Sequence, residues 1–344
     1  MIPLAKKLLE LGHTVLIGSG NEHISMFREE LPGLHYIHFP GFKPRYSRIL
    51  PQYLCILLKL PSLLVCTVSE HKKLKRIIME HNIDLVISDN RLGLWNKSIR
   101  TVYVTHMPLI PFPGAFRFME WIGIFMHGWI IRKYSYCLIP DLPGDMNLTG
   151  RLSHGIKLPP NVRFIGMLSR FSDLPSDTDR DFYPSPRTTL ILSGPEPQKS
   201  ILRNKITSLQ NESGNFIVIL EGKPESGNLV SSGGTIVSYS HLRSAEMKKL
   251  ITGSKLIISR PGYTTIMELI SMKCSALLVP TPGQTEQEYL SDYLSARGWF
   301  KTTAQRDLKS DRELTSPALP EVNGMITESK TLLEPVLNEV LQYP

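Results

Sequence analysis

The stretch from Lys255 to Gly298 constrains the fold most, because two strand–loop–helix units follow each other in it. In the first unit, a short apolar run over residues 255–259 leads through turn-forming residues into a helical pattern that begins at Ile266. In the second, a predicted strand over residues 276–279 leads through a polar loop into another helix. Strands and helices alternate along most of the chain, which predicts an α/β fold with a mostly parallel sheet.

The loop after the first of these strands has the character of an anion site. The free N–H groups at the start of a helix, together with the helix dipole, favour a phosphate group. Gly262 has no side chain and lets the backbone come close to such a group. Thr264 or Thr265 could instead be a plain N-cap, although capping and phosphate binding are compatible.

Length and composition predict two cytosolic domains without a metal centre. A chain of 344 residues exceeds the usual size of one hydrophobic core, so we expect two domains of roughly 150 residues each. The apolar fraction of 42% is sufficient for both. The four cysteines are scattered without a CxxC pair or a histidine at metal-ligand spacing, which favours reduced thiols and no metal site.

The formal charge of +8 comes from the first half of the chain. Up to Arg163 there are 20 Lys and Arg against 11 Asp and Glu, and beyond it there are 19 against 20. A basic half suggests an anionic partner, such as a phospholipid surface or a phosphorylated acceptor, although a merely soluble basic surface explains the charge equally well. Aromatic and basic residues do not interleave in a nucleic-acid motif, so no nucleic-acid partner is predicted.

One apolar stretch, from Ile49 to Val68, has almost the length of a membrane span. A spanning helix needs about 20 mostly apolar residues, and Pro51, Lys59 and Pro61 interrupt this one. We therefore expect core helices here, or a surface that touches lipid.

A second apolar stretch, from Trp121 to Ile131, could sit at a membrane interface, but burial in the domain is the favoured interpretation. The first residues lack the continuous apolar region of a secretory signal. We expect a cytoplasmic protein, with peripheral contact at the inner face of the cytoplasmic membrane as a further possibility. The interfacial candidates in this stretch are Trp121, Phe125, Met126, Trp129 and Ile131.

The chain begins with a predicted helix. Pro3 suits its first turn, Gly12 ends it, and a strand is predicted over residues 13–17. In a doubly wound domain the first helix follows a strand and a glycine-rich turn, for which there is no room here. We expect either an unusual start to the fold or a first domain whose beginning is missing.

Two polar side chains follow predicted strands of the first domain. Asp89 comes after the strand 83–88, and His106 comes after the strand 101–105. Ligands collect at the carboxyl ends of strands in open parallel sheets, so both are candidates for chemistry. A turn or cap role for Asp89, and a structural role for His106, are the alternatives.

Composition shifts predict the domain boundaries. We expect an N-terminal domain over residues 1–163, a polar, proline-flanked linker over 164–187, a second domain over 188–325, and a C-terminal helix over 326–344. In the second domain, a loop beginning at Ser193 repeats the strand, small-residue loop and helix pattern.

The two loops of the opening stretch carry a family resemblance. Residues 259–268, SRPGYTTIME, resemble the donor-binding motif of MurG-type glycosyltransferases, the family 28 C-terminal domain of GT-B enzymes. Residues 280–289, PTPGQTEQEY, look like the glutamine-bearing motif that follows it, and residues 193–195, SGP, fall where such proteins have an interdomain glycine loop. The resemblance covers most of residues 188–298 and only the general layout of the first domain.

The resemblance implies a fold of two Rossmann-like domains facing across a cleft, and a nucleotide-sugar donor bound by the second domain. Residues 260–265 would surround the diphosphate, Glu268 would accept hydrogen bonds from the ribose, and Gln284 and Gln287 would bind the sugar. Glu268 also fits a capping box with Thr265, and both glutamines could be plain surface residues. The implied donor-binding residues are Ser193, Gly194, Arg260, Gly262, Tyr263, Thr264, Thr265, Glu268, Gly283, Gln284 and Gln287.

The implied activity is transfer of a hexosyl group, with N-acetylglucosamine as a first guess, from a UDP-sugar to a cell-envelope or lipid-linked acceptor. The family reaction is inverting and needs neither an essential metal nor a cofactor. The family's N-terminal glycine loop, which usually carries a histidine, has no counterpart here, which leaves His106 and Asp89 as candidates for activating the acceptor. A non-catalytic nucleotide-sugar binder and a GT-B UDP-sugar epimerase are the alternative functions.

Overall fold

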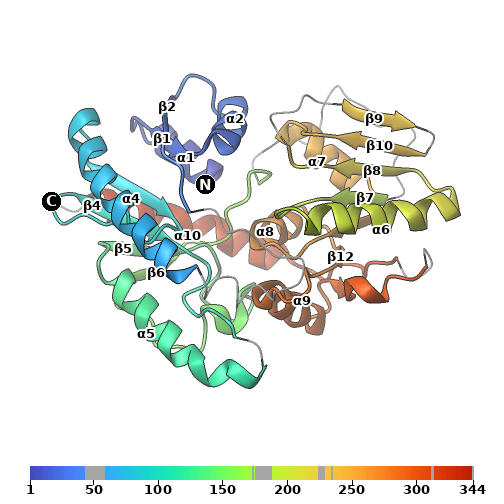
Figure 1. Cartoon of the computed structure of the whole chain (residues 1–344). Helices are drawn as coiled ribbons and strands as arrows, with labels where there is room; N and C mark the ends of the chain where they lie inside the picture. The colour runs from blue at the N-terminus through green and yellow to red at the C-terminus, as the bar shows by residue number, and fades with distance from the viewer. Residues whose placement is uncertain are drawn as a thin grey trace. The chain divides into compact units, whose positions relative to one another are not determined.

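The computed structural model describes residues 1–42, 59–112, 114–172, 174, 188–223, 229–233, 235–310 and 314–342. These residues form two compact units, and Figure 1 labels many of their helices and strands. Unit 1 contains residues 1–40 and 168–322, and unit 2 contains most of residues 41–167 together with the C-terminal residues from Asn323. The units are described one at a time.

Unit 1 is built on a seven-stranded sheet with the order β13-β12-β11-β7-β8-β10-β9. All neighbouring strands are parallel except β9, which runs antiparallel to β10. The central strands β11, β7 and β8 are buried along their whole length, as expected where helices cover both faces of a sheet. The strands are β7 (Thr188–Ile191), β8 (Ile217–Leu220), β9 (Leu229–Gly233), β10 (Ile236–Tyr239), β11 (Leu256–Ser259), β12 (Leu277–Leu278) and β13 (Lys301–Thr302).

Helices follow these strands in alternation. Their apolar faces pack on the sheet. One buried cluster joins β7, β8, β11 and β12 to Leu202 and Ile206 of α6 (Gln198–Ser213). Gly214 ends that helix in the left-handed conformation, with φ of 66°, which a glycine adopts without strain. The helices are α6 (Gln198–Ser213), α7 (Ser244–Thr252), α8 (Tyr263–Ser271) and α9 (Thr285–Ala296), with the short 3₁₀ helix η3 (Gln305–Asp307).

The first forty residues belong to the same unit. They form α1 (Ile2–Glu10), β1 (Leu16–Ser19), α2 (Asn21–Glu30) and β2 (His35–His38), and β1 and β2 pair in parallel. Two carboxylates of α2 hold this segment to the start of α7. Glu30 accepts hydrogen bonds from the backbone N–H, at 3.2 Å, and the hydroxyl of Ser244, and Glu29 Oε2 lies 2.9 Å from His241 Nε2. Acidic groups are favoured at this position because the helix N-terminus carries partial positive charge.

Unit 2 contains a four-stranded parallel sheet in the order β3-β4-β5-β6. Its strands are β3 (Leu85–Asp89), β4 (Arg100–Val104), β5 (Tyr136–Ile139) and β6 (Val162–Phe164). The described strands up to Phe164 therefore lie in two separate parallel sheets, this one and the β1-β2 pair.

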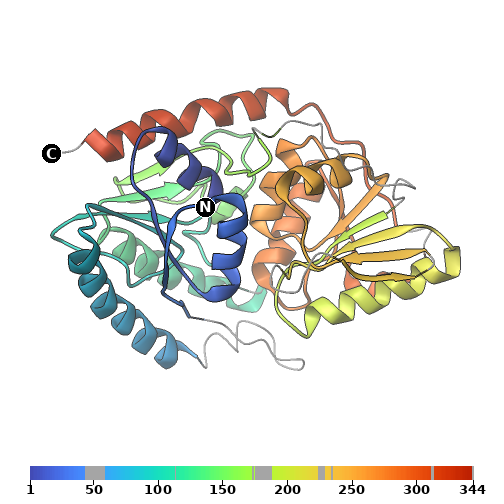
Figure 2. The same ribbon diagram turned by 90° about the horizontal axis from the view of Figure 1, so that it is seen from above.

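The helices of unit 2 are α4 (Leu60–His81), α5 (Glu120–Ile131) and α10 (Asn323–Gln342), with the 3₁₀ helices η1 (Gly114–Met119) and η2 (Gly150–Leu152). Helix α10, red in Figure 2, lies alongside the sheet. Arg163 donates two hydrogen bonds to the carboxylate of Glu339, at 2.7 and 3.0 Å. Gly166 lies so close to the carbonyl of Ser329 that a Cβ at this position would overlap it.

The observed units differ from the predicted domains at both ends of the chain. Residues 1–40 group with the second half, and the C-terminal helix groups with the first half. Most of the predicted linker, residues 175–187, lies outside the described residues, as do residues 49–58 of the first apolar stretch. The rest of that stretch is in α4, where Leu64, Val65 and Val68 are exposed and not in the core.

The second apolar stretch, in α5, also departs from its favoured interpretation. Trp121, Phe125, Met126 and Trp129 are exposed, and only Ile131 of the five interfacial candidates is buried. The prediction of burial in the domain is therefore wrong for four of them. No helix among the described residues is both long and apolar enough to cross a membrane.

Candidate functional site

The predicted anion site is a helix start at the carboxyl end of β11. Gly262 is the N-cap of α8, and its carbonyl accepts a hydrogen bond from Ile266 N at 3.0 Å. The N–H groups of a helix's first turn have no acceptor within the helix, so they are available to an anion. The sequence prediction of a strand, a glycine turn and a helix is confirmed here.

A second loop meets this one because β7 and β11 are parallel neighbours. Ile191 pairs with Ser259, so the segments after the two strands leave the same edge of the sheet. A Cβ placed on Gly262 would lie 4.0 Å from Ser193 Oγ and 3.8 Å from Thr265 Oγ1. The structure thus brings three of the predicted donor-binding positions together around a glycine.

The neighbouring residues of this group have different exposures. Thr264 is exposed and Thr265 is half-buried, so both remain accessible at the first turn of α8. Tyr263 is buried in the core, which leaves its backbone at the loop while its side chain packs inside. Gly194 has φ of 85°, a left-handed conformation that suits glycine and lets the loop after β7 turn sharply.

The glutamine-bearing loop leaves the same edge, after β12, which pairs with β11. Gln287 is buried, and its Oε1 accepts a hydrogen bond from Thr281 N at 2.9 Å. Glu288 Oε1 accepts one from Gly283 N at 2.8 Å, and Gly283 has φ of 76°. The half-buried Gln284 is the N-cap of α9. The side-chain oxygen of Gln287 therefore helps to shape the loop that contains Gln284.

Arg260 holds the framework of the site. Its side chain is 1% exposed, and burial lowers its pKa to about 10. One guanidinium nitrogen donates to the carbonyls of Val279 and Pro280 at 2.8 and 2.9 Å. The other donates to the Gln198 carbonyl at 3.0 Å and to Gln305 Oε1 at 2.6 Å. The predicted contact of this side chain with a diphosphate is corrected by these bonds, which tie α6, β12 and η3 together.

Glu268 lies on the buried side of α8 and forms an ion pair with Arg170, at 2.9 Å from Oε1 to Nε. Burial raises the pKa of the Glu268 carboxyl, and the Arg170 guanidinium opposes that shift. The alternative capping box is wrong, because the helix starts at Gly262 and no side chain caps it. The predicted hydrogen bonds of Glu268 to a ribose stay a prediction, with Arg170 as an additional residue that the sequence reasoning missed.

In unit 2, Asp89 and His106 lie at the same edge of the sheet. Asp89 ends β3 and pairs in register with Val104, two residues before His106. Asp89 is exposed and His106 is half-buried. The placement of both residues after parallel strands is as predicted, and their chemical roles stay predictions.

A buried polar chain that sequence reasoning missed supports this edge. Tyr103 is fully buried, and its hydroxyl lies 2.9 Å from Asn90 Oδ1 and 3.0 Å from His127 Nε2. His127 Nδ1 lies 3.1 Å from the Pro108 carbonyl, and burial lowers the pKa of this histidine. A neutral ring donates from Nδ1 to the Pro108 carbonyl, and the single proton of the Tyr103 hydroxyl serves either Asn90 Oδ1 or His127 Nε2. The chain holds Asn90, which has φ of 51° and directly follows Asp89.

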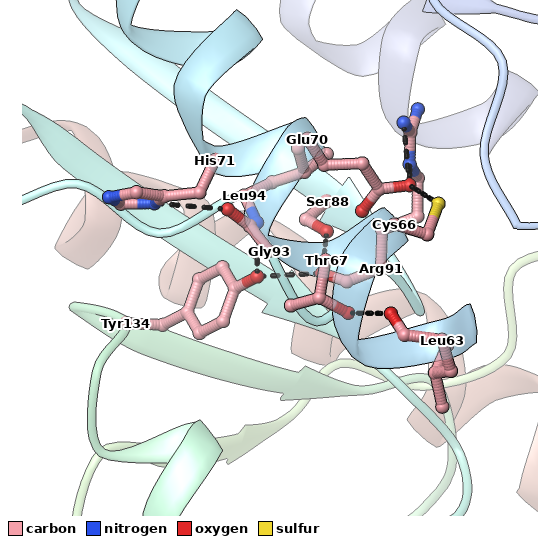
Figure 3. Close-up of polar contacts among 10 residues, drawn as sticks. All are labelled: Leu63, Cys66, Thr67, Glu70, His71, Ser88, Arg91, Gly93, Leu94 and Tyr134. Atoms are coloured by element: carbon pink, nitrogen blue, oxygen red, sulfur yellow. Dashed lines mark hydrogen bonds and ion pairs between the residues drawn. The ribbon is translucent and has the colours of Figure 1, made fainter. Parts of the chain in front are cut away.

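Figure 3 shows a second support, between α4 and the segment after β3. Arg91 donates to Glu70 Oε1 from Nε at 3.1 Å and from Nη2 at 2.9 Å, and both side chains are mostly buried. The Tyr134 hydroxyl donates to the Arg91 carbonyl at 2.7 Å. Gly93 packs against the carbonyl of Thr67 with no space for a Cβ. Asp89 therefore directly precedes a firmly held loop.

Among the residues that the structure describes, no three or more His, Cys, Asp or Glu side chains gather as a metal site would require.

Comparison with known sequences finds one family match, in the second half of the chain. Residues 204–316 match the glycosyltransferase family 28 C-terminal domain. This segment contains α8, α9 and both loops that follow β11 and β12. No curated protein sequence matches the chain.

Solved structures resemble the whole chain at low sequence identity. The glycotransferase of kitacinnamycin has a TM-score of 0.65 at 12% identity, over 99% of this chain and 95% of that one. The glycosyltransferase VinC in complex with dTDP has a TM-score of 0.56 at 15% identity, over 99% and 95%. A putative UDP-N-acetylglucosamine 2-epimerase from Listeria monocytogenes has a TM-score of 0.54 at 12% identity, over 100% and 93%.

These similarities identify the fold. The chain is an α/β protein with the GT-B fold of two Rossmann-like units, and its second half is similar in sequence to the family 28 C-terminal domain.

Proposed function

We propose that this protein is a glycosyltransferase that takes a hexosyl group, with N-acetylglucosamine as a first guess, from a UDP-sugar. The observation that carries the proposal is the meeting of Ser193 with Gly262 and Thr265 at the start of α8. Gly262 and Thr265 lie inside the segment that matches the family 28 domain. A glycine at a helix start, flanked by two hydroxyls, suits a diphosphate. The dTDP complex of the similar VinC supports a nucleoside diphosphate, and uridine is the more specific part of the proposal.

On the donor side, the first turn of α8 would bind the diphosphate through backbone N–H groups and the hydroxyls of Thr264 and Thr265. Gln284 and Gln287 would bind the sugar, and Glu268 the ribose. An amide both donates and accepts hydrogen bonds, and a carboxylate accepts two, which suits hydroxyl recognition. Arg260 has no direct role because its guanidinium is bonded inside the framework.

The reaction that we propose is an inverting displacement without a metal. The acceptor oxygen attacks the anomeric carbon, the bond from that carbon to the diphosphate oxygen breaks, and the nucleoside diphosphate leaves with the electron pair. The helix N-terminus stabilises the charge that develops on the leaving group. Asp89 or His106 would take the proton of the acceptor hydroxyl, which contributes roughly 100 to 10,000-fold to the rate.

The proposed acceptor belongs to the cell envelope or is linked to a lipid, and the proposed location is the cytoplasmic side of the membrane. The first half of the chain is basic, with 20 Lys and Arg against 11 Asp and Glu up to Arg163. This charge supports binding of the protein to an anionic membrane surface.

The direct test is release of UDP by the full chain from a panel of UDP-sugars, in the presence of EDTA, with and without a lipid-linked acceptor. We expect release that depends on the acceptor and a product with inverted anomeric configuration. Asp89→Asn and His106→Gln separate the two candidate bases, since one of them should lower kcat by roughly 100-fold or more while nucleotide affinity stays unchanged. Nucleotide binding without turnover on any acceptor would show a non-catalytic binder instead.

The epimerase is the second candidate, favoured by the structural similarity to the Listeria protein. An epimerase needs the donor pocket but no acceptor. Analysis of the sugar after incubation with UDP-N-acetylglucosamine alone would reveal the epimer, and its appearance would replace the transferase proposal.

A further inference from the structure

Helix α5 presents aromatic side chains to solvent and polar side chains to the interior of unit 2. Trp121, Phe125 and Trp129 are 66%, 69% and 56% exposed, and Phe118 in the adjoining η1 is 70% exposed. Glu120 and His127 of the same helix are buried. Figure 1 shows α5 at the periphery of unit 2. We call the outward residues the α5 face: Phe116, Phe118, Trp121, Phe125, Met126 and Trp129.

The buried polar residues fix the rotation of the helix about its axis. Glu120 Oε2 pairs with Arg151 Nη1 at 2.6 Å, and Glu120 Oε1 accepts a hydrogen bond from Phe112 N at 3.1 Å. His127 is held by Tyr103 and by the Pro108 carbonyl. Because residues four apart lie on one side of a helix, these anchors leave Trp121, Phe125 and Trp129 in one outward stripe. The exposed stripe is therefore a consequence of specific contacts.

An exposed stripe of large aromatic residues marks an interaction surface, since a soluble monomer rarely leaves such a patch uncovered. Trp and Phe at half-exposed helix positions are typical of helices that lie in the membrane interface, where the ring is buried among acyl chains and headgroups.

The charges around the α5 face identify the occupant. Arg117 in η1 and Arg132 directly after α5 are exposed, and the acidic residue of α5, Glu120, is buried against Arg151. Lys133 Nζ lies 3.5 Å from the centre of the Trp129 ring, so a cation stands at the margin of the apolar stripe. Cations beside an exposed aromatic stripe are complementary to anionic headgroups.

We infer that the α5 face docks on an anionic lipid surface, with its aromatic side chains inserted and Arg117, Arg132 and Lys133 at the headgroups. The inference deepens the membrane contact of the proposed function and names the residues that make it. It requires no donor-binding residue of unit 1, so it can be tested without donor or acceptor.

The test is flotation of the full chain with vesicles of phosphatidylcholine, with and without phosphatidylglycerol. We expect binding to the mixed vesicles and weak binding to the neutral ones. The protein carries its own probe, because two of its four tryptophans, Trp121 and Trp129, belong to the α5 face. Brominated lipid should quench their fluorescence if the rings enter the acyl region.

Matched variants locate the contact. The triple variant Trp121→Ser, Phe125→Ser, Trp129→Ser should weaken vesicle binding by at least about ten-fold for each ring removed. Arg117→Glu with Arg132→Glu should weaken it by roughly five-fold or more per cation, and only on anionic vesicles. Ile201→Ser, at a 40% exposed apolar position on α6 in unit 1, should leave binding unchanged. Circular dichroism and urea unfolding of each variant show that the chain is folded. UDP binding is measured separately, so that failure of the donor proposal and failure of this inference are distinguished.

Absence of wild-type binding to mixed vesicles would overturn the inference, and so would binding that survives the triple substitution. Light scattering, which measures the oligomeric state, distinguishes a lipid-binding face from a protein interface. A wild-type dimer that the triple variant converts to a monomer would assign the α5 face to a protein interface instead of a lipid one.

Discussion

The loop between β11 and α8 and the helix α5 break the rule of polar outside and apolar inside in opposite directions. In the loop, the charged Arg260 is 1% exposed, although its sequence context predicts a ligand contact. In α5, Trp121 is 66% exposed, although its context favours burial. The loop thus buries a charged side chain, and the helix exposes a large aromatic one.

The difference teaches that the number of available partners decides burial. Arg260 finds four acceptors from three elements, which offset the cost of taking its charge out of water. In α5, Glu120 and His127 find specific partners in unit 2, and the helix has only one orientation that satisfies both. The aromatic side chains then point outward, whatever their hydrophobicity.

The largest effect that tests this comparison is expected at Arg260. Arg260→Ala leaves four acceptors without their donor, so we expect a loss of about 4 kcal/mol in the free energy of unfolding. Arg306→Ala is the matched control, since that side chain is 88% exposed and its loss should change stability by less than about 0.5 kcal/mol. Urea unfolding followed by circular dichroism measures both. A stable Arg260→Ala protein that no longer binds UDP would mean that Arg260 contacts the ligand directly.

The next effect contrasts two adjacent residues of α5. Glu120→Ala removes the partner of Arg151 and the acceptor of Phe112 N, so we expect about 2 to 3 kcal/mol of destabilisation. Trp121→Ser should change the free energy of unfolding by less than about 0.5 kcal/mol, because the ring stands in solvent. A larger cost for Trp121 than for Glu120 would contradict the observed orientation of the helix.

A smaller effect, on the order of 1 kcal/mol, is expected from the protonation of Glu268. Burial raises its pKa in the folded protein, so the unfolded chain releases this proton at lower pH than the folded chain does. The wild type should therefore lose stability relative to Glu268→Gln as pH rises through the range above about 4.5, and the difference should level off once the folded carboxyl is ionised. Unfolding of both proteins by urea from about pH 4 to about pH 7 measures it. A gain of wild-type stability over that range would mean that Arg170 dominates.

The smallest structural change with a functional readout is Gly262→Ala. The backbone of Gly262 has φ of −74°, and the new Cβ would meet Ser193 and Thr265 only at ordinary contact distances, so the fold should tolerate it. The methyl group would nevertheless stand where a diphosphate approaches the backbone, and we expect roughly ten-fold weaker binding of UDP. Calorimetry of UDP binding is the measurement. Unchanged affinity would move the diphosphate away from this loop.

Much of the donor side was predictable because local pattern determines it. The glycine turn before α8, the strand–loop–helix order and the positions of Ser193 and Gln284 follow from residue types a few positions apart. The roles of Arg260 and Arg170 were not, since their partners lie up to about a hundred positions away in the sequence. In unit 2, the placement of Asp89 and His106 was predictable, and the chain of Asn90, Tyr103 and His127 behind them was not.

The amino-acid sequence by itself determined the α/β class, the alternating elements and the loop that we assign to the donor phosphates. Periodicity, turn residues and short motifs depend on residues that are near neighbours in the chain, so the sequence alone is enough to recognise them. Only the tertiary structure decided that Arg260 is internal, that Glu268 faces Arg170, and that the rings of α5 face outward. The physical reason is that burial depends on hydrogen-bond and ion-pair partners that folding brings together from distant parts of the chain.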